Sequence, residues 1–338
     1  MAPRIFLTGT TGYIGGTVLD TLVSRHPEYD ITVLLRNPPA GFADRYPAVK
    51  VIRGDYDSTD ILTQAASDAD VVVHSGDSDH EPSIRAIIAG LLSRSTPSFL
   101  IHLGGSGIIS DWQEDRPHGD LNPKAWSDVE DIDNIWSLDD KALHRNVDKI
   151  IQQAWAEHGQ KLKTAIVCPP DIYGKGRGPG RTRSVYVPMF YKEILDVGAP
   201  FYTASGTNTR SFVHIDDLMT VYLKLVEAAV NGGQGAEWGH EGYYFTSTQE
   251  LNQLEIARAT GRILKNKSLL STEETKQLPF DQVNQMLKHP VFGVIGRYMF
   301  ASNSRSRSDR ARKLFGYKAV APSFLDCLEE DLDYAIQK

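Results

Sequence analysis

The hydrophobic positions in the first half of the chain fall into short apolar runs separated by longer stretches with helical spacing. The runs end at polar or glycine-rich turns, and they occupy residues 5–7, 31–35, 49–52, 69–74, 98–103 and 164–168. Runs this short suit strands that are buried on both faces of a parallel sheet. The stretches between them, roughly 10–20 residues long, predict helices. Together the two patterns predict a doubly wound parallel α/β sheet.

The first run leads directly into a glycine-rich turn. Residues 8–15 read Thr-Gly-Thr-Thr-Gly-Tyr-Ile-Gly, and apolar residues at helical spacing follow them. In this pattern Gly9 permits the tight turn, Gly12 lets the backbone approach a pyrophosphate, and Gly15 lets the helix pack on the strand. The helix N-terminus then offers free N–H groups to phosphate. The pattern predicts a dinucleotide-binding corner, with an ordinary strand–helix turn as the alternative.

Length, charge and cysteine content narrow the classes of function. The chain has 338 residues, of which 41% are hydrophobic, and a net charge of −7. This charge argues against nucleic acid as a partner, because phosphate backbones attract basic surfaces. No apolar run is long enough for a membrane span, and the first strand begins too early for a signal peptide. Cys168 and Cys327 are too few for a disulfide framework, and no metal-ligand spacing stands out. We expect a reduced, cytoplasmic protein.

The end of the second predicted strand indicates which cofactor is preferred. In folds that prefer NAD, an acidic residue near this point accepts hydrogen bonds from the adenosine ribose. Arg36 stands here instead, and a guanidinium suits the 2′-phosphate of NADP. The pattern therefore favours NADP over NAD. An arginine that only faces solvent is the alternative.

Several polar residues follow the predicted strands, where ligands of such a sheet bind. Thr8, Ser75 and Ser106 each come at or just after the end of a strand and should share one rim. Asp55, which precedes Tyr56 after the third strand, can accept a hydrogen bond from an adenine amino group. It can equally cap a turn.

Two segments interrupt the regular pattern. Residues 111–141 combine many aspartates with Trp112, Trp126 and Trp136 and show no periodicity. A long irregular loop is typical of a functional lid, although the tryptophans can equally pack it against the protein. Residues 175–183 form a basic, glycine-rich loop. Its charge predicts contact with an anionic cofactor or substrate, with a solvated loop as the alternative.

Four motifs along the chain carry a family resemblance. They are the glycine pattern, Gly54-Asp55, Pro169-Pro170-x-x-Tyr173-Gly174, and Ser-Phe-Val-His-Ile-Asp-Asp at residues 211–217. Together they resemble the short-chain dehydrogenase/reductase superfamily, in its extended or atypical branch related to nucleotide-sugar epimerases. The resemblance implies NADP(H) or NAD as cofactor and a C-terminal substrate lobe. The expected cofactor contacts are Thr8, Gly9, Thr11, Gly12, Tyr13, Ile14, Gly15, Arg36, Asp55, Tyr56, Ser75, Lys149 and Pro169.

The chemistry of that superfamily depends on a Tyr-x-x-x-Lys helix and on a serine or threonine after the fifth strand. The lysine holds the nicotinamide ribose and lowers the pKa of the tyrosine, which exchanges a proton with the carbonyl oxygen. In this chain the resemblance places Lys149 at the lysine and Arg145 at the tyrosine. Arginine stays charged and cannot donate a proton in the same way, although it can stabilise an oxyanion.

Three residues are candidates to replace the tyrosine. His144 directly precedes Arg145, and imidazoles exchange protons near neutral pH. Tyr173 follows the sixth strand, on the nicotinamide side in the relatives. Ser106 can orient a carbonyl, but an unassisted serine is a weak acid. His144 and Tyr173 also have a structural interpretation, as packed or surface side chains.

These observations lead to a division of the chain and to a function. We predict that residues 1–170 form an NADP-binding Rossmann domain to which residues 206–232 return. Residues 171–205 and 233–338 should form a smaller α+β substrate lobe. The favoured function is NADPH-dependent reduction of a carbonyl or enone in a small or medium organic substrate. A non-redox isomerase, lyase or cyclase and an NADP-binding redox sensor are the alternatives. We expect a monomer or homodimer that binds neither nucleic acid nor membranes.

Overall fold

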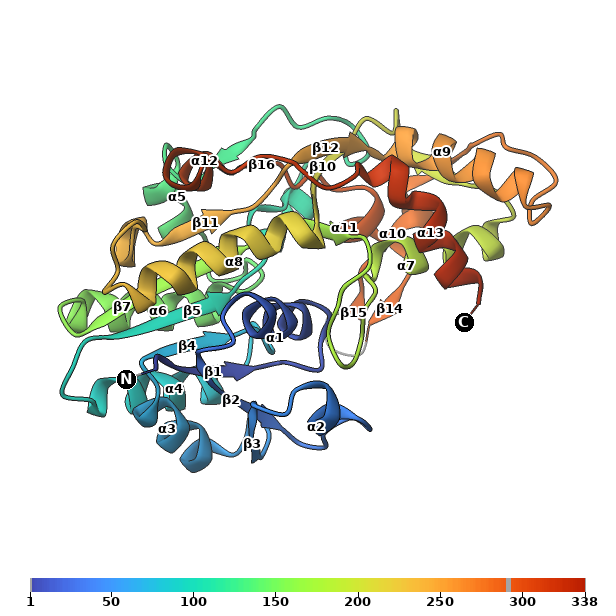
Figure 1. Cartoon of the computed structure of the whole chain (residues 1–338). Coiled ribbons are helices and arrows are strands. Elements are labelled where there is room, and N and C mark those ends of the chain that lie inside the picture. Colours follow the sequence, from blue (N-terminus) through green and yellow to red (C-terminus); the bar gives the residue numbers. More distant parts are fainter. Residues whose placement is uncertain (1, 290–292, 338) are drawn as a thin grey trace.

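A parallel sheet of seven strands forms the centre of the protein, whose computed structural model describes residues 2–289 and 293–337 (Figure 1). The strand order is β11-β7-β5-β4-β1-β2-β3, so the winding direction reverses between β1 and β4. The strands are β1 (Arg4–Thr8), β2 (Asp30–Leu35), β3 (Lys50–Arg53), β4 (Val71–His74), β5 (Ser98–Leu103), β7 (Leu162–Cys168) and β11 (Tyr243–Phe245). The predicted doubly wound Rossmann sheet is confirmed, and in such sheets ligands bind at the point of reversal.

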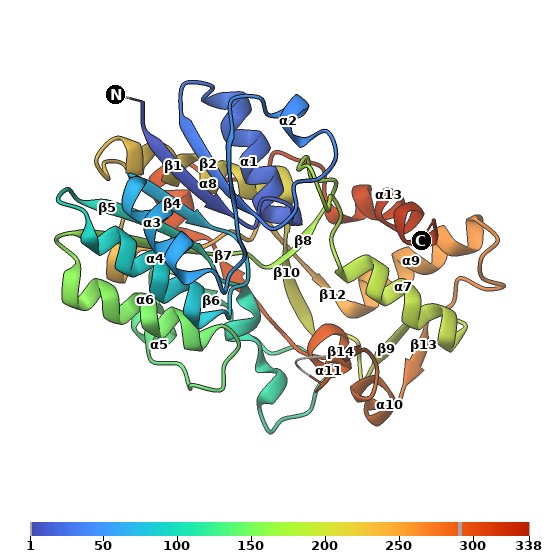
Figure 2. The same cartoon turned by 90° about the horizontal axis from the view of Figure 1, so that it is seen from below.

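Helices cover both faces of this sheet (Figures 1 and 2). One face carries α1 (Tyr13–Arg25) and α8 (Ile215–Val230), and the other carries α3 (Thr59–Asp68), α4 (Glu81–Ser93) and α6 (Arg145–His158). Alternate strand residues serve the two layers, because successive side chains of a strand point to opposite faces. In β1, Ile5 and Leu7 join the core beneath α1 and α8, and Phe6 joins the other.

A second region lies beyond the carboxyl ends of the central strands (Figure 1). Its sheets combine β8 (Asp171–Tyr173), β10 (Thr209–His214) and β12 (Gln249–Asn252), β9 (Phe201–Thr203) with β13 (Lys276–Leu278), and β14 (Lys288–His289) with β15 (Gly293–Val294). Its helices are α7 (Tyr186–Val197), α9 (Gln253–Asn266), α10 (Phe280–Asn284), α11 (Gly296–Phe300) and α13 (Phe324–Ile336). Buried aromatic rings, including Phe190, Phe201 and Phe300, pack its core in tilted and edge-to-face contacts.

Some of the chain assigned to the substrate lobe lies against the central sheet. β11 pairs with β7, and Ala311 of α12 (Asp309–Phe315) belongs to the core beneath α1 and α8. The division into two lobes stays a prediction. The short helix α2 (Phe42–Arg45) lies in the connection between β2 and β3. Within the described ranges, no helix is both long and apolar enough to cross a membrane.

Residues 111–141 contain more regular structure than their sequence suggests. They include β6 (Trp126–Ser127), which pairs with β16 (Ser306–Arg307), and α5 (Ile132–Trp136). The tryptophans contact the protein: Trp136 is buried and its Nε1 donates to the backbone oxygen of His240 at 2.8 Å. The ring of Trp112 meets that of Tyr298 edge-on at 5.9 Å. These contacts support the packed interpretation of the segment.

Candidate active site

At Gly9 and Gly15 the glycine turn leaves no space for a Cβ atom. Gly9 has a φ of 74°, and a Cβ on it would lie 2.2 Å from the backbone oxygen of Ser75. A Cβ on Gly15 would lie 2.5 Å from the backbone oxygen of Gly9. The N–H of Gly12 donates to that same oxygen at 2.8 Å, and no side chain caps the start of α1. The helix N-terminus is therefore available to phosphate groups.

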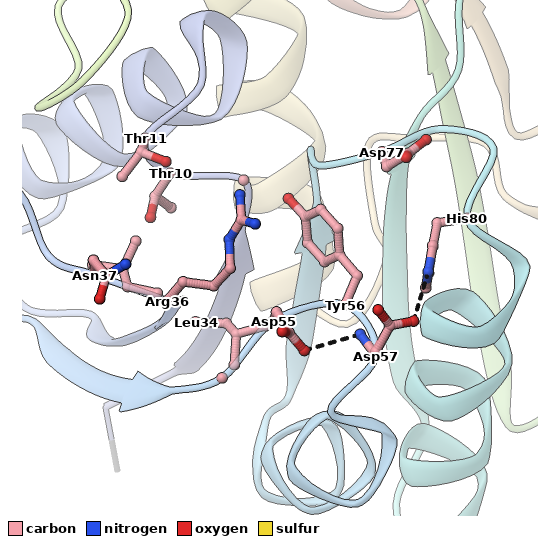
Figure 3. A pocket seen from close by; sticks show the side chains of 13 residues that line it. Thr10, Thr11, Leu34, Arg36, Asn37, Asp55, Tyr56, Asp57, Asp77 and His80 are labelled. Atoms are coloured by element: carbon pink, nitrogen blue, oxygen red, sulfur yellow. Dashed lines mark hydrogen bonds and ion pairs between the residues drawn. The ribbon is translucent and has the colours of Figure 1, made fainter. Parts of the chain in front are cut away.

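A cavity of 530 Å³ opens beside this turn (Figure 3). Arg36 and Asn37 from the end of β2 line one side of it, and Tyr56 lies beyond Arg36. The full lining is Gly9, Thr10, Thr11, Leu34, Leu35, Arg36, Asn37, Gly54, Asp55, Tyr56, Asp57, Asp77 and His80. The hydroxyl of Ser58 donates to Asp55 Oδ1 at 2.8 Å, and this bond holds the pKa of the Asp55 carboxyl below its usual value. The cavity thus offers a guanidinium and a charged carboxylate to a ligand.

A second cavity of 300 Å³ begins at the same turn and reaches the second region. It is lined by Gly12, Tyr13, Ile14, Ser75, Gly76, Leu103, Pro170, Asp171, Ile172, Arg181, Ser184, Val185 and Tyr186. The charge of Asp171 is balanced by the buried Arg210, whose Nε lies 2.5 Å from Asp171 Oδ2. Arg181 forms no ion pair with a carboxylate of residues 2–289 and 293–337. Its backbone N–H donates to the oxygen of Thr11 at 3.0 Å, which ties the basic loop to the glycine turn.

Nine of the thirteen expected cofactor residues line these two cavities. The first is lined by Gly9, Thr11, Arg36, Asp55 and Tyr56, and the second by Gly12, Tyr13, Ile14 and Ser75. Thr8 is buried behind the turn, where its hydroxyl lies 2.6 Å from His74 Nδ1. Pro169 accepts a hydrogen bond from the N–H of Ser106 at 2.9 Å through its backbone oxygen. Contact with a cofactor stays a prediction for all of them.

The structure brings neither Lys149 nor Arg145 to the glycine turn. Lys149 is exposed, its Nζ lies 2.7 Å from Asp140 Oδ1, and it lines a separate cavity between α4 and α6. Arg145 is buried, and its guanidinium donates to the backbone oxygens of Leu138 at 3.0 Å and Trp136 at 2.5 Å. The sequence pattern predicts that the helix resumes at Asp139, whereas α6 begins at Arg145. The structure therefore does not support the assignment of Lys149 and Arg145 to the Tyr-x-x-x-Lys positions.

His144 and Asp148 face the sheet instead. They are four residues apart, a spacing that places two side chains on one side of a helix. A Cβ on Gly105 would lie 2.9 Å from His144 Nε2, and a Cβ on Gly104 would lie 3.8 Å from Asp148 Oδ1. Burial raises the pKa of the Asp148 carboxyl to about 7. The pair therefore lies directly beyond the carboxyl end of β5.

The other two candidate residues have different surroundings. Ser106 is buried immediately after Gly105, and the hydroxyl of Ser304 donates to its backbone oxygen at 2.8 Å and to its Oγ at 3.2 Å. Tyr173 points into the second region, where its hydroxyl donates to the backbone oxygen of Pro322 at 2.8 Å. Burial raises the pKa of Tyr173, and it lines neither cavity of the turn. Its position favours packing over proton transfer.

Sequence reasoning missed Asp79 and Asp148. The Nδ1 of His144 lies 3.0 Å from Asp79 Oδ1, a contact between segments 65 residues apart that no local pattern reveals. Asp148 did leave a signal: it falls on the same helical face as the apolar Val147 and Ile151, which are buried. An acidic residue on a buried face is uncommon and points to a special environment.

A doubly wound sheet with an open helix N-terminus at its point of reversal defines a dinucleotide-binding protein. Sequence comparison agrees: the NAD(P)H-binding family model matches residues 9–176, and that of the NAD dependent epimerase/dehydratase family matches residues 142–238. Over these residues the chain is thus similar to NAD(P)H-binding proteins and to NAD-dependent epimerases and dehydratases. The resemblance to extended short-chain dehydrogenases is thereby confirmed.

The individual relatives and solved structures that the chain resembles share less than 30% of their residues with it. The chain is 29% identical to the oxidase ucsJ of Acremonium sp., over all of this chain and 98% of that protein. It is 21% identical to a dTDP-glucose 4,6-dehydratase of Mycobacterium tuberculosis, over 77% of each. Among solved structures, DesIV, a dTDP-glucose 4,6-dehydratase from Streptomyces venezuelae with NAD and TYD bound, has a TM-score of 0.66 at 16% identity, over 99% of this chain and 97% of that one. This likeness shows the fold.

Proposed function

We propose that the protein is an NADPH-dependent oxidoreductase that reduces a carbonyl or enone of a small or medium organic substrate. One observation carries the proposal: two cavities of different character meet at the glycine turn. The cavity of 530 Å³ is rich in polar side chains, and that of 300 Å³ carries several apolar ones. This arrangement suits a nucleotide whose reactive end meets an organic substrate.

The residues of the larger cavity fit the adenosine end of NADP. Arg36 offers forked, charge-assisted hydrogen bonds to a 2′-phosphate, and Asp55 offers a carboxylate to an adenine amino group. The open N-terminus of α1 suits the pyrophosphate. When bound, NADPH supplies a hydride. The residues of the chain hold the nucleotide in place and bring a substrate carbonyl to the reactive end of the nucleotide.

The smaller cavity indicates the kind of substrate. Ile14, Leu103 and Ile172 offer apolar contacts to a hydrocarbon skeleton. Ser75 offers a hydroxyl to a carbonyl group of the substrate, and Arg181 offers a guanidinium to a phosphate of the nucleotide. We infer a compact organic molecule with one or two polar groups, which matches the usual composition of such sites.

A second candidate is a reaction without net redox. It is favoured by the 21% identity with a dTDP-glucose 4,6-dehydratase across 77% of the chain. In that case product would form while the concentration of reduced nucleotide stayed constant.

The two candidates are separated by one assay. Calorimetry first measures binding of NADPH and NADH to the purified protein, and we expect NADPH to bind more tightly. A panel of carbonyl and enone compounds is then incubated with NADPH, and both nucleotide oxidation and product are measured. One mole of NADPH lost per mole of product supports the reductase, whereas product at constant NADPH supports the second candidate. The absence of binding to either nucleotide in folded protein would overturn both.

A further inference from the structure

We propose that His144 is the proton-transfer group of this site and that Asp79 is its positioning residue. The inference rests on the proposed function, since it assigns the group that protonates the product. It is carried by the position of the imidazole, by its hydrogen bond to a carboxylate, and by the backbone conformation that holds it.

The imidazole of His144 lies at the carboxyl end of β5. Its Nε2 is so close to Gly105 that a Cβ there would lie 2.9 Å away, and Ser106 is the next residue. Leu103, two residues before Gly105, lines the cavity of 300 Å³. The ring nitrogen therefore lies where ligands of a parallel sheet bind. The side chain is 18% exposed, so water can still reach it.

The other ring nitrogen is held by Asp79. His144 Nδ1 lies 3.0 Å from Asp79 Oδ1 and 3.2 Å from Oδ2, so the ring donates its Nδ1–H to the carboxylate. The amide of Asn146 donates to the backbone oxygen of Asp79 at 2.9 Å, which fixes the Asp79 loop to α6. A carboxylate on Nδ1 orients the ring, leaves Nε2 for a substrate and stabilises the imidazolium.

The backbone of His144 supports a functional interpretation. Its φ is 67°, in the left-handed region that residues other than glycine rarely occupy. Residues that adopt such a conformation cluster at functional sites. Here it turns the chain into α6 at the point where the ring must reach Gly105.

Three other titratable groups face this imidazole or lie near it. Asp79 comes from the loop after β4, Asp148 from the next turn of α6, and His102 from β5. Burial lowers the pKa of His102, so its ring is neutral. In the described part of the chain, neither of its ring nitrogens has a hydrogen-bond partner. Of these three groups, the Asp79 carboxylate is the one that contacts the His144 ring directly.

In the proposed step, His144 gives the proton on Nε2 to the carbonyl oxygen of the substrate. The carbonyl carbon receives hydride, two electrons and one hydrogen, from NADPH, and the carbonyl becomes an alcohol as NADPH becomes NADP⁺. The imidazole is left neutral and regains its proton from water. The step therefore needs a protonated His144 and no further co-reactant.

The first test compares three variants. His144→Asn suits the backbone, because asparagine tolerates left-handed φ values. We expect it to lower kcat at least about 100-fold and to change the Kd of NADPH by less than about threefold. Asp79→Asn should lower kcat roughly 10-fold and change the pH profile of kcat, since the ring loses its carboxylate partner. His158→Asn, at the far end of α6, is the control and should behave as the parent.

A second measurement does not depend on turnover. In protein labelled at histidine nitrogen, NMR identifies the His144 ring by its absence in His144→Asn. We expect its Nδ1–H signal and its titration to change in Asp79→Asn. If His144→Asn keeps more than half of the parent kcat, or if the ring is insensitive to Asp79, the assignment is overturned. A parent protein that binds neither nucleotide would instead reject the proposed function.

Discussion

Gly9 and Ser75 approach each other at the point where the winding of the sheet reverses. A Cβ on Gly9 would lie 2.2 Å from the backbone oxygen of Ser75, and Gly9 has a φ of 74°. The contact joins the ends of β1 and β4, which are neighbours in the sheet. Both the conformation and the lack of space therefore require glycine at this position.

We predict that Gly9→Ala destabilises the protein by about 3 kcal/mol or more and abolishes nucleotide binding. Gly41→Ala is a matched control, because Gly41 has the same φ of 74° and a Cβ on it would meet no atom within 4 Å. It should cost only the conformational strain, about 1 kcal/mol. Chemical denaturation and calorimetry with NADPH measure both effects. Equal losses at the two positions would show that the contact with Ser75 is unimportant.

The preference for NADP depends on Arg36. We predict that Arg36→Gln weakens NADPH binding by roughly 10- to 100-fold, the loss expected for charge-assisted hydrogen bonds of about 1.5–3 kcal/mol. Binding of NADH should stay within about twofold, because it lacks the 2′-phosphate. Arg53→Gln is the control: Arg53 ends the next strand, and its guanidinium donates to the backbone oxygen of Arg36 at 3.2 Å. A parallel loss for both nucleotides in Arg36→Gln would contradict the assignment.

Arg181 provides a test of the basic loop. Its side chain lines the smaller cavity, close to Gly12. We predict that Arg181→Ala weakens NADPH binding about 10-fold at low salt and less at high salt, as expected for a contact with phosphate. The exposed Lys175 of the same loop is the control. If Lys175→Ala has the same effect, general attraction by the loop explains the loss.

The sequence was sufficient to predict the fold and the tight glycine turn after the first strand. The apolar runs marked the strands because parallel strands are buried on both faces, and the glycine pattern marked the turn because its backbone allows no Cβ. These features are local. The face of α6 that meets the sheet is not a local feature, because it depends on how a helix of known position is rotated about its axis.

Two pairs of residues on α6 could face the sheet, and they differ by a shift of one residue along the helix. Arg145 and Lys149 have the same spacing as His144 and Asp148, so motif spacing alone cannot choose between the pairs. The choice is made by contacts outside the helix: the backbone oxygens of Trp136 and Leu138 hold Arg145, and Gly104 and Gly105 leave space for the other pair.

Because Lys149 lies in an exposed ion pair and not at the glycine turn, its replacement should have little effect on cofactor binding. Its ion pair with Asp140 is solvent-exposed, and such pairs contribute about 0–1 kcal/mol. We predict that Lys149→Ala changes kcat and the Kd of NADPH by less than about twofold. Steady-state kinetics and calorimetry measure this directly. A loss of nicotinamide binding would instead return Lys149 to the role that the family motif suggests.

Asp148 makes the stability of the protein depend on pH. Its side chain is buried, Tyr243 donates to its Oδ2 at 3.4 Å, and its Oδ1 has no hydrogen-bond partner in the described residues. Burial raises its pKa from an ordinary value of 3.8 to about 7. The folded protein therefore holds this proton at pH values where the unfolded chain has lost it. The stability from this group is full below about pH 4 and is lost as the pH rises to about 7.

We predict that Asp148→Asn removes the pH dependence of stability that Asp148 causes. At pH 4 the variant and the parent should be of similar stability, whereas at pH 8 the variant should be more stable by about 4 kcal/mol, because the parent then carries a buried charge. Urea denaturation at the two pH values gives the difference. Asp115→Asn, at an exposed position, should show no such change. Asp128, whose pKa burial also raises to about 7, keeps its own pH dependence in every variant. A constant difference between Asp148→Asn and the parent would mean that Asp148 is ionised throughout.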